Sequence, residues 1–187
     1  FRLFGRDAGF TALETGIATW ADRVLIPEVA CDIGRLAALV EGDRHNPGGY
    51  SIIVVSEGAN LGTAVHEMGA PDAYGHRKKS NVAEFLAAEL GKRLAGVRFL
   101  PMDLTYILRS GEPDVYDKRM AIFYANLVMS LVERGIPGAM SAYQSGDFVY
   151  TDIPGKDLPP RRVDPSAYNA DRYRPNFEHV TGSYMPQ

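Results

Sequence analysis

The sequence has little of several features that would assign its class directly. Cys31 is its single cysteine among 187 residues, so no disulfide can form within the chain, which fits a reducing compartment. No run of 18 or more apolar residues occurs, and no membrane-spanning helix is expected. The 20 basic residues do not exceed the 23 acidic ones, and a net charge of −3 argues against nucleic acid as the main partner.

Common cofactor and catalytic motifs are also missing. No glycine loop of the P-loop or dinucleotide-binding type occurs in the sequence. The stretch HEMGA (66–70) begins like a zinc-protease helix but lacks the second histidine, and the four histidines show no metal-binding spacing. No Ser-His-Asp or Cys-His set can be assembled from the sequence. We therefore expect no metal ligands within this chain.

What remains is the composition of a globular protein, with 45% hydrophobic and 23% charged residues. A chain of this length corresponds to one domain, or to one and a half small ones. The sequence does not begin with methionine, so we expect it to begin inside a longer protein or after a processing event.

Short apolar runs alternate with amphipathic ones in the first hundred residues. After the strand-like opening FRLFG, buried strands are predicted at 23–29, 50–58 and 96–101. Helices are predicted at 10–21, 32–43 and 80–96, the last capped by Ser80 or Asn81 and ended by Gly96. This alternation predicts an α/β fold with a parallel sheet flanked by helices on both faces.

The second half has a different pattern. The helix predicted at 116–135 is apolar nearly all round, so we expect it to be buried on most sides, although the chain offers few elements to surround it. One more strand is predicted at 146–153. Half of the twelve prolines lie in the tail, 154–187, which is predicted to be an irregular but ordered arm. The aromatic residues that should anchor this arm are Tyr168, Tyr173, Phe177 and Tyr184.

Polar residues follow three of the predicted strands, where open parallel sheets bind their ligands. Arg6 precedes a helix whose first N–H groups favour anions, unless Asp7 caps that helix instead. Glu57 ends an apolar strand, and its carboxylate suits sugar hydroxyls or a metal and repels phosphate. Tyr106 and Arg109 are three residues apart and can grip a phosphate from one helical face. Solvated surface side chains are the alternative for all four.

Three stretches, in this order, carry a family resemblance: FGRDAGFTALETGIATWADRVLIPEV (4–29), IVVSEGA (53–59) and LTYILRSGEPDVYDKRMA (104–121). Together they resemble the carboxyl-terminal half of a 6-phosphofructokinase, most closely its pyrophosphate-dependent and mixed-substrate branch. The resemblance implies a phosphofructokinase-like fold of Rossmann-like layers that is incomplete without an amino-terminal half. It also implies a glycolytic phosphotransferase that converts fructose 6-phosphate into fructose 1,6-bisphosphate.

The resemblance also implies roles for particular residues. Phe4, Gly5 and Arg6 stand at the family's Met-Gly-Arg triplet, with Phe4 replacing the usual methionine in the wall of the fructose 6-phosphate site. Glu57 matches the glutamate that holds sugar hydroxyls. The four residues Tyr106, Ile107, Leu108 and Arg109 match the element that binds the 6-phosphate. Arg98 lies near another phosphate-binding arginine of the family, but its interval to Tyr106 is two residues longer, so we assign it no role.

The family's catalytic base, its donor-phosphate loop and its Mg²⁺ ligand are expected before Phe1, so this chain alone should be inactive. We expect pyrophosphate as the donor in preference to ATP, a homodimer or homotetramer, a cytoplasmic location, and no membrane or nucleic-acid partner. The predicted divisions are an acceptor-side domain (1–103), a segment that packs on the missing half (104–153) and the arm. The alternatives are a non-catalytic phosphosugar-binding or regulatory subunit, an ATP-dependent enzyme, and an α/β domain without a retained site.

Overall fold

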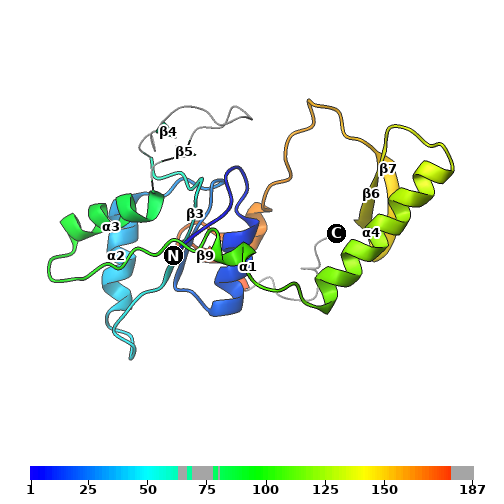
Figure 1. Ribbon diagram of the computed structural model, residues 1–187. Coiled ribbons are helices and arrows are strands. Elements are labelled where there is room, and N and C mark those ends of the chain that lie inside the picture. Colours follow the sequence, from blue (N-terminus) through cyan, green and yellow to red (C-terminus); the bar gives the residue numbers. More distant parts are fainter. Residues whose placement is uncertain (63–66, 69–77, 80, 178–187) are drawn as a thin grey trace. The chain divides into compact units, whose positions relative to one another are not determined.

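A computed structural model describes residues 1–62, 67–68, 78–79 and 81–177 of the chain (Figure 1). The chain divides into two compact units. Within the described residues, the first unit takes in 1–108 and 160–177, and the second takes in 109–159. The first unit is therefore discontinuous in sequence, because the chain leaves it, builds the second unit and then returns.

The first unit is built on a parallel sheet, as predicted. Its strands are β1 (Arg2–Leu3), β3 (Ile53–Ser56) and β2 (Arg23–Leu25), in that spatial order. Leu3 pairs with Ser56 on one side of β3, and Leu25 pairs with Val55 on the other. β2 is shorter than the strand predicted at 23–29, because Pro27 cannot donate a ladder hydrogen bond. β3 is shorter than the strand predicted at 50–58, because the chain turns at Glu57 and Gly58.

The three predicted helices of this unit are α1 (Phe10–Thr19), α2 (Ile33–Asp43) and α3 (Val82–Arg93). Asn81 caps α3 by accepting hydrogen bonds from the N–H groups of Ala83 and Glu84. Asp32 caps α2 in the same way. The residue before α1 is Gly9, so Asp7 does not cap that helix.

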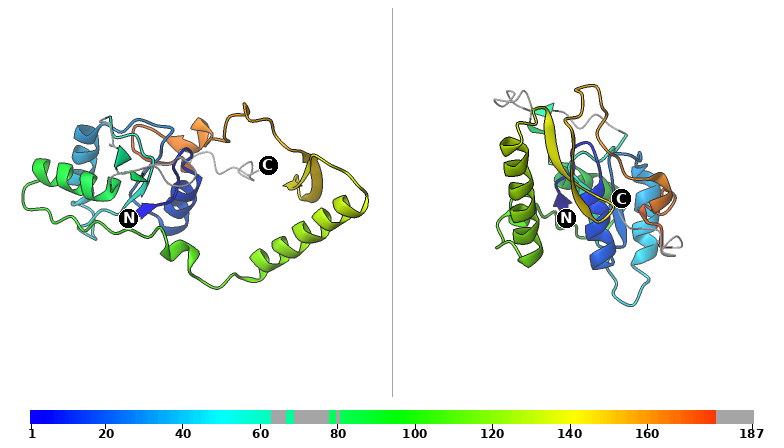
Figure 2. Two further views of the ribbon diagram at one scale, coloured as in Figure 1. Left: turned by 45° about the horizontal axis from the view of Figure 1, so that its top comes forward. Right: turned by 90° about the vertical axis from the view of Figure 1, so that its right-hand side faces the viewer.

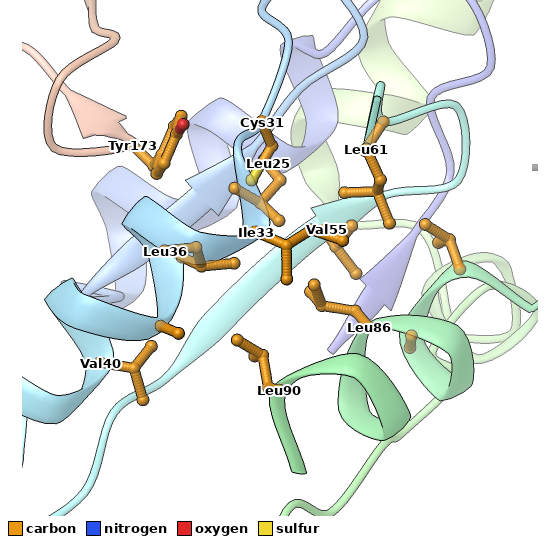
Figure 3. Packing of buried hydrophobic residues seen from close by; sticks show 14 residues of the cluster. Leu25, Cys31, Ile33, Leu36, Val40, Val55, Leu61, Leu86, Leu90 and Tyr173 are labelled. Carbon is orange, nitrogen blue, oxygen red and sulfur yellow. The ribbon is translucent and has the colours of Figure 1, made fainter. Parts of the chain in front are cut away.

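The helices cover both faces of the sheet, because neighbouring strand residues point to opposite sides. Leu25 and Val55 face α2 and α3, where they join one buried cluster (Figure 3). Val24 and Val54 face α1 and join a second cluster. Two layers of helix around one sheet confirm the predicted α/β class. A short antiparallel pair, β4 (Glu67–Met68) and β5 (Lys78–Lys79), lies between β3 and α3 in the sequence.

The strand predicted at 96–101 is wrong. Pro101 has no N–H group to donate to a neighbouring strand, and Leu100 is 67% exposed. Pairing starts only beyond the proline: the N–H of Arg2 donates to the carbonyl of Met102 (2.8 Å), and that of Leu104 donates to the carbonyl of Arg2 (3.0 Å). The result is a single parallel bridge between Arg2 and Asp103 on the outer side of β1.

The second unit consists of α4 (Val115–Glu133) packed on a hairpin of β6 (Ala139–Gln144) and β7 (Asp147–Asp152). The predictions of α4 and β7 are confirmed, whereas β6 was not predicted. Phe123 of α4 stacks on Phe148 of β7, with ring centroids 4.8 Å apart. The rest of α4 is largely exposed, including Met129 and Val132, so the described residues do not bury this helix on most sides as predicted.

Of the predicted arm (154–187), residues 160–177 are described and belong to the first unit, and from here on we call these residues the arm. They return to the first unit beside α1 and β2 (Figures 1 and 2). The arm contains a short 3₁₀ helix, η2 (Pro165–Ala167), and the paired strands β8 (Tyr168–Asn169) and β9 (Arg174–Pro175). Tyr168 and Tyr173 are buried. Phe177 stacks on Trp20 at 5.0 Å. The fourth expected anchor, Tyr184, lies outside the described residues.

Candidate functional site

Three chain segments with predicted site residues leave the sheet at the same edge. Phe4–Arg6 follow β1 and Glu57 follows β3, and these two strands are parallel neighbours. Tyr106 follows the segment that bridges to β1 in the same direction at Asp103. The edge at which parallel strands end is where α/β sheets bind ligands. The topology therefore brings these three segments together.

The loops after β1 and β3 are in direct backbone contact. The N–H of Gly58 donates to the carbonyl of Gly5 (3.0 Å), and Ser56 Oγ donates to the same carbonyl (2.9 Å). A Cβ atom on Gly58 would lie 1.8 Å from the carbonyl oxygen of Arg6, and one on Gly5, whose φ is +136°, would lie 2.2 Å from Ser56 Oγ. Both positions therefore require glycine, because the two loops would otherwise be pushed apart.

Arg2 connects the glutamate at this edge with the third segment. Its Nη1 donates to Asp103 Oδ2 at 2.6 Å, and its Nη2 lies 3.7 Å from Glu57 Oε2. Arg2 Nε is buried and has no hydrogen-bond partner in the described part of the chain. The guanidinium therefore binds the carboxylate of Asp103 directly and attracts that of Glu57 by charge alone, which favours a Glu57 side chain turned toward Arg2.

The environment of Asp103 favours its charged form. Partial burial acts to raise the pKa of Asp103, but hydrogen bonds from Thr105 and the positive charge and hydrogen bond of Arg2 together outweigh it and lower the pKa below its ordinary value. Asp103 is therefore ionised at neutral pH and keeps its hold on Arg2. Thr105, whose N–H donates to Asp103 Oδ1 (3.1 Å), leads directly into Tyr106.

Aromatic and apolar side chains complete the edge. The rings of Phe4 and Tyr106 meet edge to face, with centroids 6.2 Å apart. Tyr106 is nevertheless 82% exposed, and Ile107 and Leu108 are exposed beside it. Such a surface can contact a ligand that is itself partly apolar, such as the ring of a sugar.

The last predicted site residue, Arg109, lies at the boundary between the two units. Ile107–Arg109 form a short 3₁₀ helix, η1, which Tyr106 directly precedes and Arg109 ends. Arg109 is the first residue of the second unit. The residues that the first unit itself brings together are therefore Phe4, Gly5, Arg6 and Glu57, with the segment Tyr106–Leu108.

Sequence reasoning missed Arg2 and Asp103. The signal for Arg2 was a charged residue inside a buried strand, because such a charge is found there only with partners. Asp103 had no local signal, because its partner is 101 residues away in the sequence.

The groups at this edge suit the binding of a polar ligand. In the described part of the chain, no three histidine, cysteine, aspartate or glutamate residues are grouped so that they could hold a metal ion. His66 of the HEMGA stretch lies outside the described residues. None of the described helices combines the length and the apolar character needed to cross a bilayer. A carboxylate, an arginine and a phenol at one edge can bind hydroxyls and an anion.

The fold and this edge define a parallel α/β domain with a polar ligand site at the ends of its strands. Comparison with known proteins agrees with that class of domain and identifies one family within it. The Phosphofructokinase family model matches residues 2–132. The chain belongs to the phosphofructokinase family, which confirms the resemblance found in the sequence.

Relatives with either phosphoryl donor are similar to this chain. A pyrophosphate--fructose 6-phosphate 1-phosphotransferase from Thermoproteus tenax is 36% identical over 83% of the chain and 45% of its own length. An ATP-dependent 6-phosphofructokinase from Streptomyces coelicolor is 36% identical over 78% of the chain and 43% of its own length. The chain thus spans less than half the length of these curated relatives.

A solved structure shows the same fold. The pyrophosphate-dependent phosphofructokinase from Marinobacter aquaeolei has a TM-score of 0.74, covering 95% of this chain and 45% of that one. The sequence identity is 16%, so this likeness concerns the fold alone.

Proposed function

We propose that this chain is the fructose 6-phosphate-binding half of a phosphofructokinase that phosphorylates the 1-hydroxyl of fructose 6-phosphate, with pyrophosphate as the donor. The observation that carries the proposal is the meeting of Glu57, the loop of Arg6 and Tyr106 at one edge of the sheet. The family match supports the same reading.

Each site residue has a role that its chemistry and place allow. The carboxylate of Glu57, oriented by Arg2, accepts hydrogen bonds from sugar hydroxyls. Arg6 and Arg109 supply guanidinium groups to the 6-phosphate, which Tyr106 joins through its hydroxyl group. Phe4, Ile107 and Leu108 form apolar contacts with the sugar. Gly5 allows the two loops to touch, and this contact sets the spacing of Arg6 and Glu57.

Phosphoryl transfer needs groups beyond this edge. A bound Mg²⁺ would supply neutralisation of the charge on the transferred phosphate, and the described residues do not offer a site for it. We place its ligands, the catalytic base and the donor site in the part of the relatives that this chain does not span. The donor preference is proposed from the Thermoproteus relative, with ATP as the alternative from the Streptomyces relative.

The second unit fits the same proposal. Ile122, Met129 and Val132 of α4 are exposed apolar side chains, which a partner surface would bury. We propose that residues 104–153 pack on the amino-terminal half of the enzyme, and that the enzyme is a cytoplasmic homodimer or homotetramer.

Kinetics of the intact protein test the proposal. Glu57→Gln and Arg109→Ala should each raise KM for fructose 6-phosphate by about 10- to 100-fold, because the substrate loses a hydrogen bond to a charged side chain. KM for the donor should stay unchanged. Glu14→Gln, on the exposed side of α1, is the matched control. An unchanged KM for the sugar removes the substituted residue from the site. Binding of fructose 6-phosphate without phosphoryl transfer would favour a non-catalytic subunit instead.

A further inference from the structure

The loop that carries Arg6 has a second anchor, away from the sheet. Residues 4–9, which we call the substrate loop, end at Gly9, the residue before α1. The N–H of Gly9 donates to both carboxylate oxygens of Glu28, at 3.0 and 3.1 Å. The positive end of α1 is thus already compensated by a carboxylate of this chain. Glu28 comes from the segment after β2, so it ties the end of the loop to the sheet.

The arm contacts the same loop and the residues that flank it. Arg162 Nη1 donates to the carbonyl oxygen of Asp7 at 3.0 Å, one residue after Arg6. The N–H of Val163 donates to Glu28 Oε1 at 2.9 Å, so one carboxylate serves both the arm and Gly9. Arg161 lies over the ring of Phe10 at 5.6 Å, at the start of α1. Three consecutive arm residues therefore contact the loop, its capping carboxylate and the first turn of the helix.

The arm is itself fixed to the sheet, so these contacts are made from a rigid support. The hydroxyl of Tyr168 donates to the carbonyl of Val24 at 2.5 Å, and the N–H of Val24 donates to the carbonyl of Tyr173 at 2.6 Å. Arg23 Nη1 donates to the carbonyl of Arg172 at 3.0 Å. Val163 is 3% exposed and belongs to the cluster beneath α1.

We propose that the arm is a positioning element of the sugar-phosphate site, and that Arg162 and Glu28 are positioning residues for Arg6. Neither side chain needs to touch the substrate, because both act on the backbone of the substrate loop at Asp7 and Gly9. The loop is then held at both ends: at Gly5 by Ser56 and Gly58, and at Asp7 and Gly9 by the arm and Glu28. Arg6 lies between these two anchors in the sequence. This inference rests on the proposed role of Arg6 in binding the sugar phosphate.

Fixing the loop before binding favours affinity, since the conformational freedom of the loop need not be lost when the ligand arrives. Releasing the loop should therefore weaken binding of the sugar phosphate and leave binding of the donor unchanged. A misplacement of about 1 Å can cost about 100-fold in rate, so a loop loosened at one end should show an effect of about tenfold.

The test uses Arg162→Ala in the intact protein, because Arg162 is an exposed residue whose loss leaves the core unchanged. Asp171→Ala is the matched control: it removes a contact of the arm with Arg35 (2.9 Å) that does not involve the loop. We expect Arg162→Ala to raise KM for fructose 6-phosphate about tenfold. Hydrogen exchange at the amide of Gly9 should become faster, while the amides of β2 and β3 exchange as before. Asp171→Ala should change neither quantity.

A double-mutant cycle separates positioning from a general loss of structure. In the background of Arg6→Ala, Arg162→Ala should have no further effect on KM, because the group that it positions is gone. Arg162→Lys should recover part of the loss, since lysine can also donate to one carbonyl oxygen. Unchanged exchange at Gly9, unchanged KM in Arg162→Ala, or additive effects with Arg6→Ala would each overturn the inference.

The proposed function and this inference can fail separately. If Arg6→Ala alone leaves KM for fructose 6-phosphate unchanged, the proposed role of Arg6 is wrong, whatever the arm does. If Arg6→Ala raises KM but Arg162→Ala does not, the site stands and the positioning role of the arm falls. Exchange at Gly9 requires no substrate, so it reports on the anchor independently of both kinetic results.

Discussion

Arg2 and Asp103 form a salt bridge of 2.6 Å that joins the first strand of the sheet to the segment before Tyr106. Their backbones are bridged as well, so one residue pair fixes a segment that comes a hundred residues later in the chain. Glu57 lies 3.7 Å from the same guanidinium. Charge pairing therefore organises the ligand edge, although neither Arg2 nor Asp103 was expected to belong to it.

Replacing Arg2 by methionine should destabilise the protein and weaken the site together. Two carboxylates lose their shared cation, while methionine retains most of the apolar volume of the side chain. We expect a loss of about 1–3 kcal/mol in the free energy of unfolding, measured in urea, because hydrogen bonds to charged groups contribute on this scale. Arg35→Met is the control, since its pair with Asp171 is solvent-exposed and should contribute less than about 1 kcal/mol. Equal losses in the two variants would contradict this account.

Asp103 should give the protein an acid-sensitive contribution to stability. The pKa of Asp103 is lowered in the folded chain, so its contribution is present above the unfolded pKa of about 4 and is lost as the pH falls through the lower folded value. Asp103→Asn should therefore be less stable than the parent at neutral pH and lose less stability below pH about 4. Urea titrations at several pH values measure this slope. Parallel pH profiles for the two proteins would exclude Asp103 as its source.

Gly58→Ala should disrupt the ligand edge. Its Cβ atom would lie 1.8 Å from the carbonyl oxygen of Arg6, so the two loops must separate. We expect a destabilisation of more than about 2 kcal/mol, with loss of fructose 6-phosphate binding by calorimetry. Gly42→Ala, at a helical position with no atom within 4 Å of the new methyl group, should instead be neutral or stabilising by up to about 1 kcal/mol. Normal sugar binding by Gly58→Ala would show that the contact is dispensable.

Cys31 should be chemically protected and should make the protein sensitive to alkali. Burial raises the pKa of its thiol from 9.0 to about 12, against the opposing effect of a hydrogen bond from Tyr173. Iodoacetamide at pH 8 should therefore label the folded protein far more slowly than the urea-unfolded chain.

The same shift gives the sign of the alkaline effect. Between pH 9.0 and about 12 the folded state keeps a proton on Cys31 that the unfolded chain releases. The contribution of Cys31 to the free energy of unfolding is therefore fully present below pH 9.0 and is lost as the pH rises toward about 12. Cys31→Ala should show a shallower alkaline loss, although Tyr168 and Tyr173 retain theirs because burial raises the pKa of both. Identical alkaline profiles would contradict the assignment.

Local sequence patterns predicted most of the first unit. β2 and β3 lie in largely apolar runs with clear ends, and α3 is preceded by Asn81, a residue with a capping side chain, so nearby residues indicate where these elements lie. The parallel order of β1 and β3 then brings Arg6 and Glu57 to one edge, which is why part of the candidate site could be foreseen.

Long-range pairing explains what could not be predicted. Residues 96–101 have the composition of a strand, but Pro101 prevents the ladder that the pattern suggests. β6 mixes small, apolar and polar residues (AMSAYQ) without clear alternation, and its partner β7 stabilises it. The carboxylate at the start of α1 comes from Glu28, 19 residues beyond Gly9, so a search for a local cap could only offer Asp7.

Because the chain returns to the first unit, the position at which a truncated fragment ends decides whether β2 stays covered. The family match ends at residue 132, inside α4, and leaves the arm outside it. A fragment cut at that boundary would lose Tyr173, whose carbonyl accepts the N–H of Val24 on the outer strand β2. An uncovered outer strand can pair with another chain. Truncation at residue 132 should therefore expose β2 and promote aggregation through it, and a fragment that extends through Phe177 should aggregate less.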